Sequence, residues 1–294
     1  MSKRKHPVGR GGLVVDLVRD AMPSLTTSEK RAAQALVADY PLLGLETVAR
    51  FADRAGVSAP SILRFIGRIG FASYADFQRR LMAEVEARLL SPLAKADAGS
   101  PSTRKRAPRT AFAEAAADNI AETFRRLPNG EFEAVATLLA DPRRPVHLIG
   151  GRFTDALARY MTAHLRILRP NVSHLEGQRD NWHDQLLDMG NRDVLFLIDI
   201  RRYQDDLVAF AAEAARLKVT TIVLTDQWLS PAARSARHVL PARIAVPSAW
   251  DSSVALLALI EALVAEVTAR RGAESRSRMA AIETIRRQGQ PQSR

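Results

Sequence analysis

Apolar and polar residues near the beginning of the chain recur at helical spacing. Residues 49–71 predict two short helices, with Gly56 as the left-handed residue of the turn and Pro60 in the first turn of the second helix. Ser58 is expected to cap that second helix. Its apolar stripe consists of Ile62, Phe65, Ile66 and Ile69. Four residues are then left to face outward, namely Ala59, Ser61, Arg64 and Arg68.

Two short helices joined by a glycine turn, with an arginine on the open face of the second, are typical of a helix-turn-helix reader of DNA. An ordinary helical hairpin remains the alternative. Capping-box spacing at 26–29 predicts a preceding helix through Tyr40, ended by Pro41. Ser73 and Asp76 are expected to cap a following helix that runs to about Leu90.

From Phe112 onward, short β-rich runs alternate with helical patterns. The predicted strands are 146–150, 172–176, 193–200, 220–226 and 238–240. The predicted helices between and after them lie near 153–168, 182–188, 204–217 and 252–270. This alternation favours an α/β fold with a parallel sheet covered on both faces.

The chain therefore divides into an α-helical region and an α/β region. The predicted domains are 1–90 for DNA binding and an α/β domain at 111–272, with a tail at 273–294. Between them, residues 91–110 lack periodicity, are rich in Pro, Ser and basic residues, and are interpreted as a linker. Their Arg-Lys-Arg cluster is either a solvated tether or a weak additional phosphate contact.

Positive charge is concentrated around the helix-turn-helix. Residues 1–110 hold 19 Lys and Arg against 10 Asp and Glu, a net charge of +9, whereas the remaining 184 hold 24 against 22, a net +2. Neutralisation of DNA phosphates requires such a concentration.

Composition excludes several other classes of site and protein. The chain has no cysteine, which rules out disulfides, thiol nucleophiles and cysteine-based metal sites. The basic beginning is followed by a segment too short and too charged for a signal-peptide core. Glu261 and Glu266 interrupt the most apolar stretch, 253–267, so no membrane span is expected. We therefore expect a cytoplasmic protein.

Several short motifs of the helical region belong to one known pattern: Ala-Gly-Val-Ser at 55–58, Ser-Ile-Leu-Arg-Phe at 61–65 and Ile-Gly-Phe at 69–71, followed by Tyr74, Phe77 and Gln78. Through these motifs the chain resembles the RpiR-like (MurR/RpiR) family of bacterial transcription regulators. The resemblance implies a helix-turn-helix domain followed by a sugar isomerase (SIS) domain, at 111–272, that binds an effector, dimerises and has a flavodoxin-like, five-stranded parallel sheet. It also implies homodimers or homotetramers, and control by a phosphorylated sugar at the carboxyl ends of the strands.

Two loops of the chain depart from that family. The first, Gly-Gly-Arg-Phe-Thr-Asp at 150–155, stands where the family has Gly-x-Gly-x-Ser, and its glycines still let backbone N–H groups approach an anion. The second, Asp-Ile-Arg-Arg-Tyr-Gln at 199–204, replaces Ser-x-Ser-Gly-x-Thr. Arg201 and Arg202 either grip a carboxylate or phosphate, or fill the pocket and pair with nearby acids, leaving a dimerisation module. The acids in question are Asp199, Asp205 and Asp206.

A third segment, 247–253, is expected to lie at the same crevice. Ser248, Asp251 or Ser252 can cap the last long helix, and Trp250 is either a stacking wall or an interface aromatic. The expected effector-binding residues are Gly150, Gly151, Arg152, Thr154, Arg201, Arg202, Gln204, Ser248, Asp251 and Ser252.

Catalysis has weaker support in the sequence. Glu176, His174 and His183 are candidate acid/base groups, with Asp199 less favoured, and only His174 and Glu176 share a strand face. The six histidines are scattered without metal-ligand spacing, and neither a P-loop nor a GxGxxG motif is present. We therefore expect no enzyme activity, no metal and no cofactor.

These observations favour an effector-responsive regulator that binds double-stranded operator DNA and a small anionic metabolite, a sugar phosphate or carboxylate. Helix 59–69 is predicted to enter the major groove with Arg64 at a guanine edge and Ser61 at bases or phosphate, beside Ser58 and Ala59. Arg68, Arg79 and Arg80 are candidates for phosphate contacts, the alternative being ordinary exposed arginines. A sugar-phosphate isomerase and a non-sensing DNA-binding dimer remain the other hypotheses.

Overall fold

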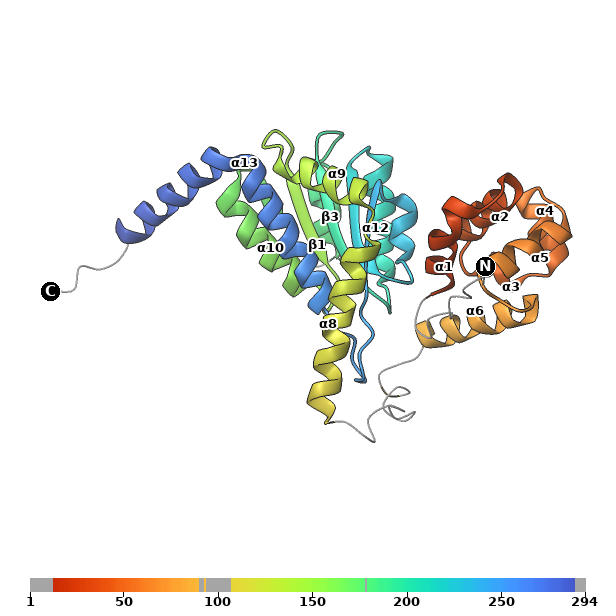
Figure 1. Ribbon diagram of the computed structural model, residues 1–294. Helices are drawn as coiled ribbons and strands as arrows, with labels where there is room; N and C mark the ends of the chain where they lie inside the picture. Colours follow the sequence, from red (N-terminus) through yellow and green to blue (C-terminus); the bar gives the residue numbers. More distant parts are fainter. Residues whose placement is uncertain (1–12, 90–92, 94–106, 178, 289–294) are drawn as a thin grey trace. The chain divides into compact units, whose positions relative to one another are not determined.

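The computed structural model describes residues 13–89, 93, 107–177 and 179–288. The chain divides into two compact units, Met1–Leu90 and Ser91–Arg294. The first is helical and the second is built on a parallel sheet (Figure 1). The α/β fold class predicted from the sequence is confirmed.

The described part of the first unit consists of helices and one 3-10 turn. Their bounds are α1 (Val14–Ala21), the turn Met22–Ser24, α2 (Thr27–Ala38), α3 (Leu42–Leu45), α4 (Val48–Ala55), α5 (Ala59–Arg68) and α6 (Tyr74–Leu89). The predicted capping box is present at the start of α2, where Thr26 and Glu29 bond each other's backbone N–H groups. Ser73 Oγ accepts from the N–H of Asp76 at the start of α6, as predicted.

The turn between α4 and α5 follows from its residues. Gly56 ends α4 with φ 61°, a left-handed conformation, and a Cβ there would collide with the guanidinium of Arg31. Pro60 lies in the first turn of α5, where a missing N–H costs no helical hydrogen bond. The predicted stripe Ile62, Phe65, Ile66 and Ile69 is buried in the core of this unit. The two helices are therefore the pair that the sequence predicts.

The second unit holds a five-stranded sheet in the order β2-β1-β3-β4-β5, with every pair parallel. The strands are β1 (Val146–Gly150), β2 (Val172–His174), β3 (Val194–Asp199), β4 (Thr220–Asp226) and β5 (His238–Ala242). The helices are α8 (Pro108–Arg126), α9 (Asn129–Ala140), α10 (Asp155–Leu168), α11 (Arg179–Leu186), α12 (Asp205–Arg216) and α13 (Val254–Gln288), with a 3-10 turn at Pro231–Ser235.

Helices cover both faces of this sheet (Figure 1). Alternate residues of β3 divide between two cores: Val194, Phe196 and Ile198 pack with α9, α10 and α13, whereas Leu195 and Leu197 pack with α11 and α12. A sheet buried on both faces explains why β3 is a nearly continuous apolar run and why Ile222, Val223 and Leu224 are consecutive in β4. It also leaves the strand ends as the place for polar groups.

Two segments differ from the sequence prediction. Helix α8 begins at Pro108, inside the predicted linker 91–110, because proline suits the first turn of a helix. The other linker residues lie outside the described part of the chain, except Leu93 and Ala107. Helix α13 continues past Gly272, which has φ 46° and ψ −111° and joins two helical stretches, so residues 273–288 of the predicted tail are helical.

Candidate functional site

The outer surface of α5 differs in one respect from the sequence prediction. Arg64 is exposed as expected, but Ser61 is only 5% exposed, so its predicted outward position is wrong. The hydroxyl of Ser61 contacts that of Ser58 at 2.9 Å and accepts a hydrogen bond from Nη2 of Arg64, also at 2.9 Å. Ser58 occupies the N-cap position without a side-chain capping bond. The two serines thus orient Arg64.

Three other arginines of this unit pair with acidic groups of their own chain. Arg68 lies 3.5 Å from the buried Glu29, Arg79 pairs with Asp76, and Arg80 lies 3.4 Å from Glu84. Leu63, which the sequence analysis did not single out, is 50% exposed beside Arg64. Ala59 is half-buried. The open surface of α5 therefore combines Arg64 with an apolar side chain.

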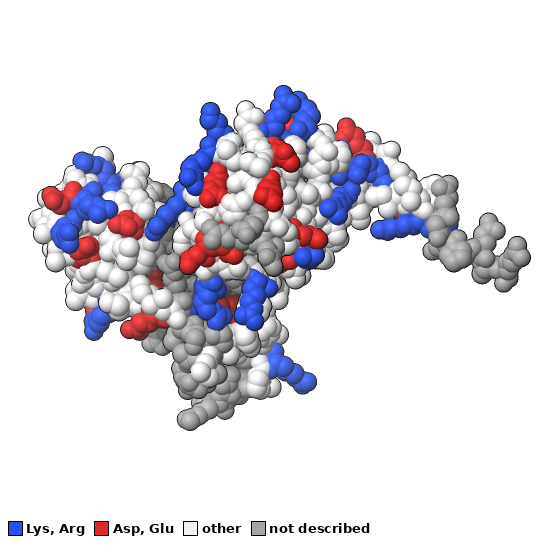
Figure 2. Space-filling view, turned by 180° about the vertical axis from the view of Figure 1, so that it is seen from behind, with Lys and Arg blue, Asp and Glu red and all other residues white. Residues whose placement is uncertain are grey.

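The excess of basic residues in the first 110 positions lies mainly in the sequence before and after residues 13–89. Residues 13–89 hold 10 Lys and Arg against 9 Asp and Glu, whereas residues 1–12 hold 4 against none and residues 90–110 hold 5 against 1. On the face shown in Figure 2, basic and acidic side chains are interspersed over each unit. The net charge of +9 over residues 1–110 therefore comes largely from the sequence on either side of residues 13–89, which contribute +1.

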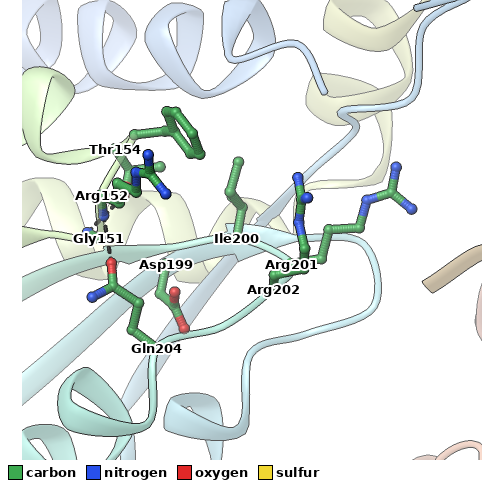
Figure 3. A pocket seen from close by; sticks show the side chains of 9 residues that line it. Gly151, Arg152, Thr154, Asp199, Ile200, Arg201, Arg202 and Gln204 are labelled. Carbon is green, nitrogen blue, oxygen red and sulfur yellow. Dashed lines mark hydrogen bonds between the residues drawn. The ribbon is translucent and has the colours of Figure 1, made fainter. Parts of the chain in front are cut away.

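A cavity of about 380 Å³ opens in the second unit at the carboxyl ends of β1 and β3. This is the point where the strand order reverses, the usual ligand position in open parallel sheets. Figure 3 shows Arg152 on one side of Ile200 and Arg202 on the other, with Asp199 and Gln204 below them in this view. Six of the predicted effector residues line the cavity: Gly151, Arg152, Thr154, Arg201, Arg202 and Gln204.

Four backbone N–H groups of the first loop, those of Gly151, Arg152, Thr154 and Asp155, have acceptors within the chain. The N–H of Gly151 donates to Thr154 Oγ1 at 2.8 Å, and the N–H of Arg152 donates to Gln204 Oε1 (Figure 3). The N–H groups of Thr154 and Asp155 donate to the carbonyl of Gly151 at 3.0 and 2.8 Å. A Cβ on Gly151 would meet Gln204 Oε1 at 2.7 Å, so this glycine permits the close approach of Gln204.

Two buried carboxyl groups lie at the ends of β3 and β4. Asp199 is 2% exposed and accepts from the hydroxyl of Ser230, while Asp226 accepts from the N–H groups of Arg201 and Trp228 and from the hydroxyl of Tyr203. Burial raises the pKa of Asp199 to about 7, against the opposing hydrogen bond from Ser230. Burial also raises the pKa of Asp226.

Arg201 pairs with Asp251. Its Nε donates to Asp251 Oδ2 at 2.7 Å, a second bond joins Nη2 to Oδ1, and its guanidinium lies 4.6 Å from the ring centroid of Trp228. The sequence left open whether the loop arginines bind a ligand or pair with Asp199, Asp205 or Asp206. The buried ion pair of Arg201 is instead with Asp251, which the segment before α13 brings close. Arg202 is exposed with φ 28°.

Two aromatic side chains flank the cavity. Phe153 and Trp250 are 57% and 56% exposed, and their rings meet edge-on with centroids 5.8 Å apart. Together with Arg201, Arg202 and Asp251 they border an adjoining hollow of about 400 Å³. Ser252 accepts from the N–H of Val254 at the start of α13, and Ser248 accepts from that of Trp250.

The candidate acid/base residues divide between two places. His174 lies 3.5 Å from Glu176 and 2.7 Å from Asp155, and Arg159 bridges the two carboxylates. His183 instead pairs with Glu213 at 2.8 Å. None of these three candidates, His174, Glu176 and His183, is among the described residues that line the 380 Å³ cavity. Asp199, the fourth candidate, does line this cavity.

Within the described ranges, no group of three or more His, Asp or Glu side chains is arranged to hold a metal ion. None of the helices formed by those same residues is long and apolar enough to cross a membrane.

Residues 138–266, which include the whole sheet, match the family model of the SIS domain. This region is a SIS domain. The cavity at the ends of β1 and β3 therefore belongs to the SIS domain of this chain.

Two solved structures extend the comparison. The sugar isomerase domain of the RpiR transcription factor from Sphaerobacter thermophilus is 26% identical, with a TM-score of 0.56, and the match covers 60% of this chain and 98% of that one. The Vibrio vulnificus NanR protein, complexed with ManNAc-6P, is 14% identical with a TM-score of 0.53 over 92% of this chain and 97% of its own. A search of curated proteins gives no match.

Several residues at the SIS site were missed by sequence reasoning. Phe153 lies in the loop 150–155, but nothing in the sequence indicated that its ring would contact that of Trp250. Asp226 is the last residue of β4 and Ser230 lies in the loop that follows, and this position at the end of a buried strand was the available signal. The pairing of Arg201 with Asp251 spans 50 residues and has no local signal.

Proposed function

We propose that this chain is an RpiR-like transcription regulator whose helical unit binds operator DNA and whose SIS domain binds a small anionic effector. The observation that carries the proposal is the presence, in one chain, of a glycine-turn helix pair with Arg64 on its open face and a SIS domain with a cavity at its strand ends. The likeness of the SIS domain to that of an RpiR transcription factor supports it.

For DNA contact, α5 lies along the major groove with Arg64 at a guanine edge. Arg64 suits this role because its guanidinium is exposed and oriented by the hydroxyl of Ser61. Ser61 then acts as a positioning residue, while Ser58 and Ala59 lie near the sugar-phosphate backbone. Leu63 is available for apolar contact with a thymine methyl group.

For effector binding, the cavity at the ends of β1 and β3 is large enough for one sugar-sized molecule. The NanR protein binds a sugar phosphate, ManNAc-6P, on a similar fold, which supports an anionic sugar derivative as the ligand class here. Arg152 and Arg202 supply positive charge at the cavity.

In the proposed mechanism, coupling between ligand and DNA involves two or more copies of the chain. We propose a homodimer or homotetramer in which SIS domains dock, so that ligand binding shifts the population of docked arrangements and thereby the spacing of two DNA-binding units. An operator with two half-sites is expected from such symmetry.

One observation favours a second candidate function, sugar-phosphate isomerisation. The carboxyl of Asp199 lines the cavity, and burial raises its pKa to about 7, within the range of a general base at neutral pH. Incubation of the full chain with aldose and ketose phosphates tests this candidate, and conversion of one to the other supports it over the regulator.

The proposed function is tested by selection of bound duplexes from a random-sequence DNA library with the full chain. We expect enrichment of a two-half-site sequence, bound about a thousandfold or more tighter than an unrelated duplex in the same salt. Recovery of no preferred sequence overturns the proposal.

A further inference from the structure

Residues 243–252, between β5 and α13, form a closed loop that we call the neck loop. Its ends are joined by a hydrogen bond at 2.9 Å from the N–H of Ser252 to the carbonyl of Ile244, whose side chain is fully buried in the core of the SIS unit. Its length and its joined ends are those of an Ω-loop. Because the two ends are bonded to each other, a displacement of one end is passed to the other.

One end of the neck loop is bonded to the SIS cavity. Asp251 accepts from Nε of Arg201 at 2.7 Å in their buried ion pair, and Arg201 lines the 380 Å³ cavity. Trp250 and Asp251 also border the adjoining hollow, where the ring of Trp250 contacts that of Phe153. A ligand in the cavity or in the hollow therefore lies against this end of the neck loop or against its bonded partner.

The other end of the neck loop is bonded to α8. The side-chain amide of Asn119 donates to the carbonyl of Ala245 at 2.9 Å, and the N–H of Arg243 donates to Thr123 Oγ1, also at 2.9 Å. Two residues of extended chain rise about 6.6 Å and four residues of helix rise about 6 Å, so these two bonds fit one face of α8. Figure 1 shows this part of the neck loop beside α8.

Helix α8 connects the SIS domain to the preceding part of the chain. It begins at Pro108, directly after residues 91–107, and lies before the residues 138–266 that match the SIS family model. The two hydrogen bonds between α8 and the neck loop depend steeply on distance, and a displacement of about 1 Å is enough to break them. A movement of the neck loop therefore changes what holds α8.

We propose that the neck loop carries the effector signal from the SIS cavity to α8, with Asp251 and Asn119 as the positioning residues at its two ends. A ligand that contacts Trp250 or the loop of Arg201 more favourably in one arrangement of the neck loop shifts the population toward that arrangement. The bonds to α8 are made or broken with it. The inference rests on the proposed function, because it takes this cavity as the effector site.

The lack of cysteine in the chain allows a test in which the effector need not be known. R202C introduces one thiol at a residue that lines both the cavity and the hollow, and N-ethylmaleimide attached to this thiol occupies the site. Hydrogen exchange of the full chain, measured by mass spectrometry before and after labelling, reports on the opening of α8. We expect labelling to change the exchange rate of α8 amides by about threefold or more.

Two substitutions in α8 test whether the neck loop is the route. N119A removes the donor to Ala245, and T123V removes the acceptor of the N–H of Arg243. Each of them, combined with R202C, should reduce the response of α8 to the label to less than about half. Unchanged exchange of the β3 amides shows that each variant keeps its fold.

Two controls accompany these variants. D118A, combined with R202C, should leave the response intact, because Asp118 is the exposed neighbour of Asn119 on α8 and forms no hydrogen bond with the described neck loop. R143C, labelled in the same way, should leave α8 unchanged, because Arg143 is 86% exposed and pairs with Asp141 before β1, at the other end of that strand.

The outcomes also distinguish this inference from the proposed function. Unchanged exchange of α8 after labelling of R202C overturns the inference, and so does a response that N119A and T123V both leave intact. If α8 responds through the neck loop but the label leaves operator affinity unchanged, the inference stands and effector control of DNA binding is wrong. Recovery of no operator counts against the proposed function alone.

Discussion

Both oxygens of the Asp251 carboxylate bind the guanidinium of Arg201, with side chains only 7% and 4% exposed. Because removal of one member leaves a buried charge uncompensated, D251N should lower the free energy of unfolding by about 3–5 kcal/mol. All three tryptophans, Trp182, Trp228 and Trp250, lie in the SIS unit, so tryptophan fluorescence during urea unfolding reports on this unit. R201M combined with D251L should be less destabilised than D251N, and a cost below about 1 kcal/mol for D251N contradicts the buried pair.

Two glycines of the helix-turn-helix should respond in opposite directions to alanine. Gly67 lies within α5 with open space at its Cβ position, so G67A should stabilise the helical unit by about 0.5–1 kcal/mol. At Gly56, φ is 61°, a left-handed angle that alanine adopts only with strain, so G56A should destabilise by about 1 kcal/mol or more. Scanning calorimetry of the full chain measures both, and a stabilising G56A contradicts the turn geometry.

Asp199 should make the free energy of unfolding decrease as pH rises. Its pKa is about 7 in the folded protein, against about 3.9 in an unfolded chain, so the folded state holds the proton more firmly between these values. Stability from this group is therefore present at low pH and is lost as pH rises through 7.

The measurement is urea unfolding at pH 5 and pH 8, followed by tryptophan fluorescence. D199N removes the titration while Asp226 and Asp206 remain, so the variant should gain stability relative to the parent between the two pH values. An unchanged difference between variant and parent at both pH values would show that Asp199 titrates normally.

The flanking basic residues should control the salt dependence of DNA binding. Residues 1–12 contain Lys3, Arg4, Lys5 and Arg10, whereas residues 13–89 are nearly balanced in charge. Replacing these four by glutamine should reduce the slope of log affinity against log salt by up to about 3.6, if each contacts a phosphate. The ratio of specific to unrelated-duplex affinity should stay constant, and a large fall in that ratio contradicts a purely electrostatic role.

The local pattern was sufficient for most of the fold. The helix pair was predicted from residues within it, namely Gly56, Pro60 and the stripe from Ile62 to Ile69. The apolar run of β3 likewise predicts that this strand is buried on both faces. Parallel pairing then follows from the alternation of strand and helix.

The details of the candidate sites were less accessible because they depend on distant segments or on helix phase. Arg201 binds Asp251, fifty positions away, in preference to the acids beside it. Gln204 reaches back to the loop after β1 because Gly151 leaves room for it. Ser61 was assigned to the open face, yet it is buried and bonds Arg64 from the edge of the stripe. Spacing along one helix does not decide whether a residue at the border of the apolar stripe is buried or exposed.

The central claim, that α5 reads DNA through Arg64, is tested most directly by the affinity of R64A for the selected operator. Fluorescence anisotropy at fixed salt should show a loss of about 1–3 kcal/mol with relaxed preference at one base pair, while R143A binds like the parent. Equal operator affinity of R64A and the parent chain would contradict the account.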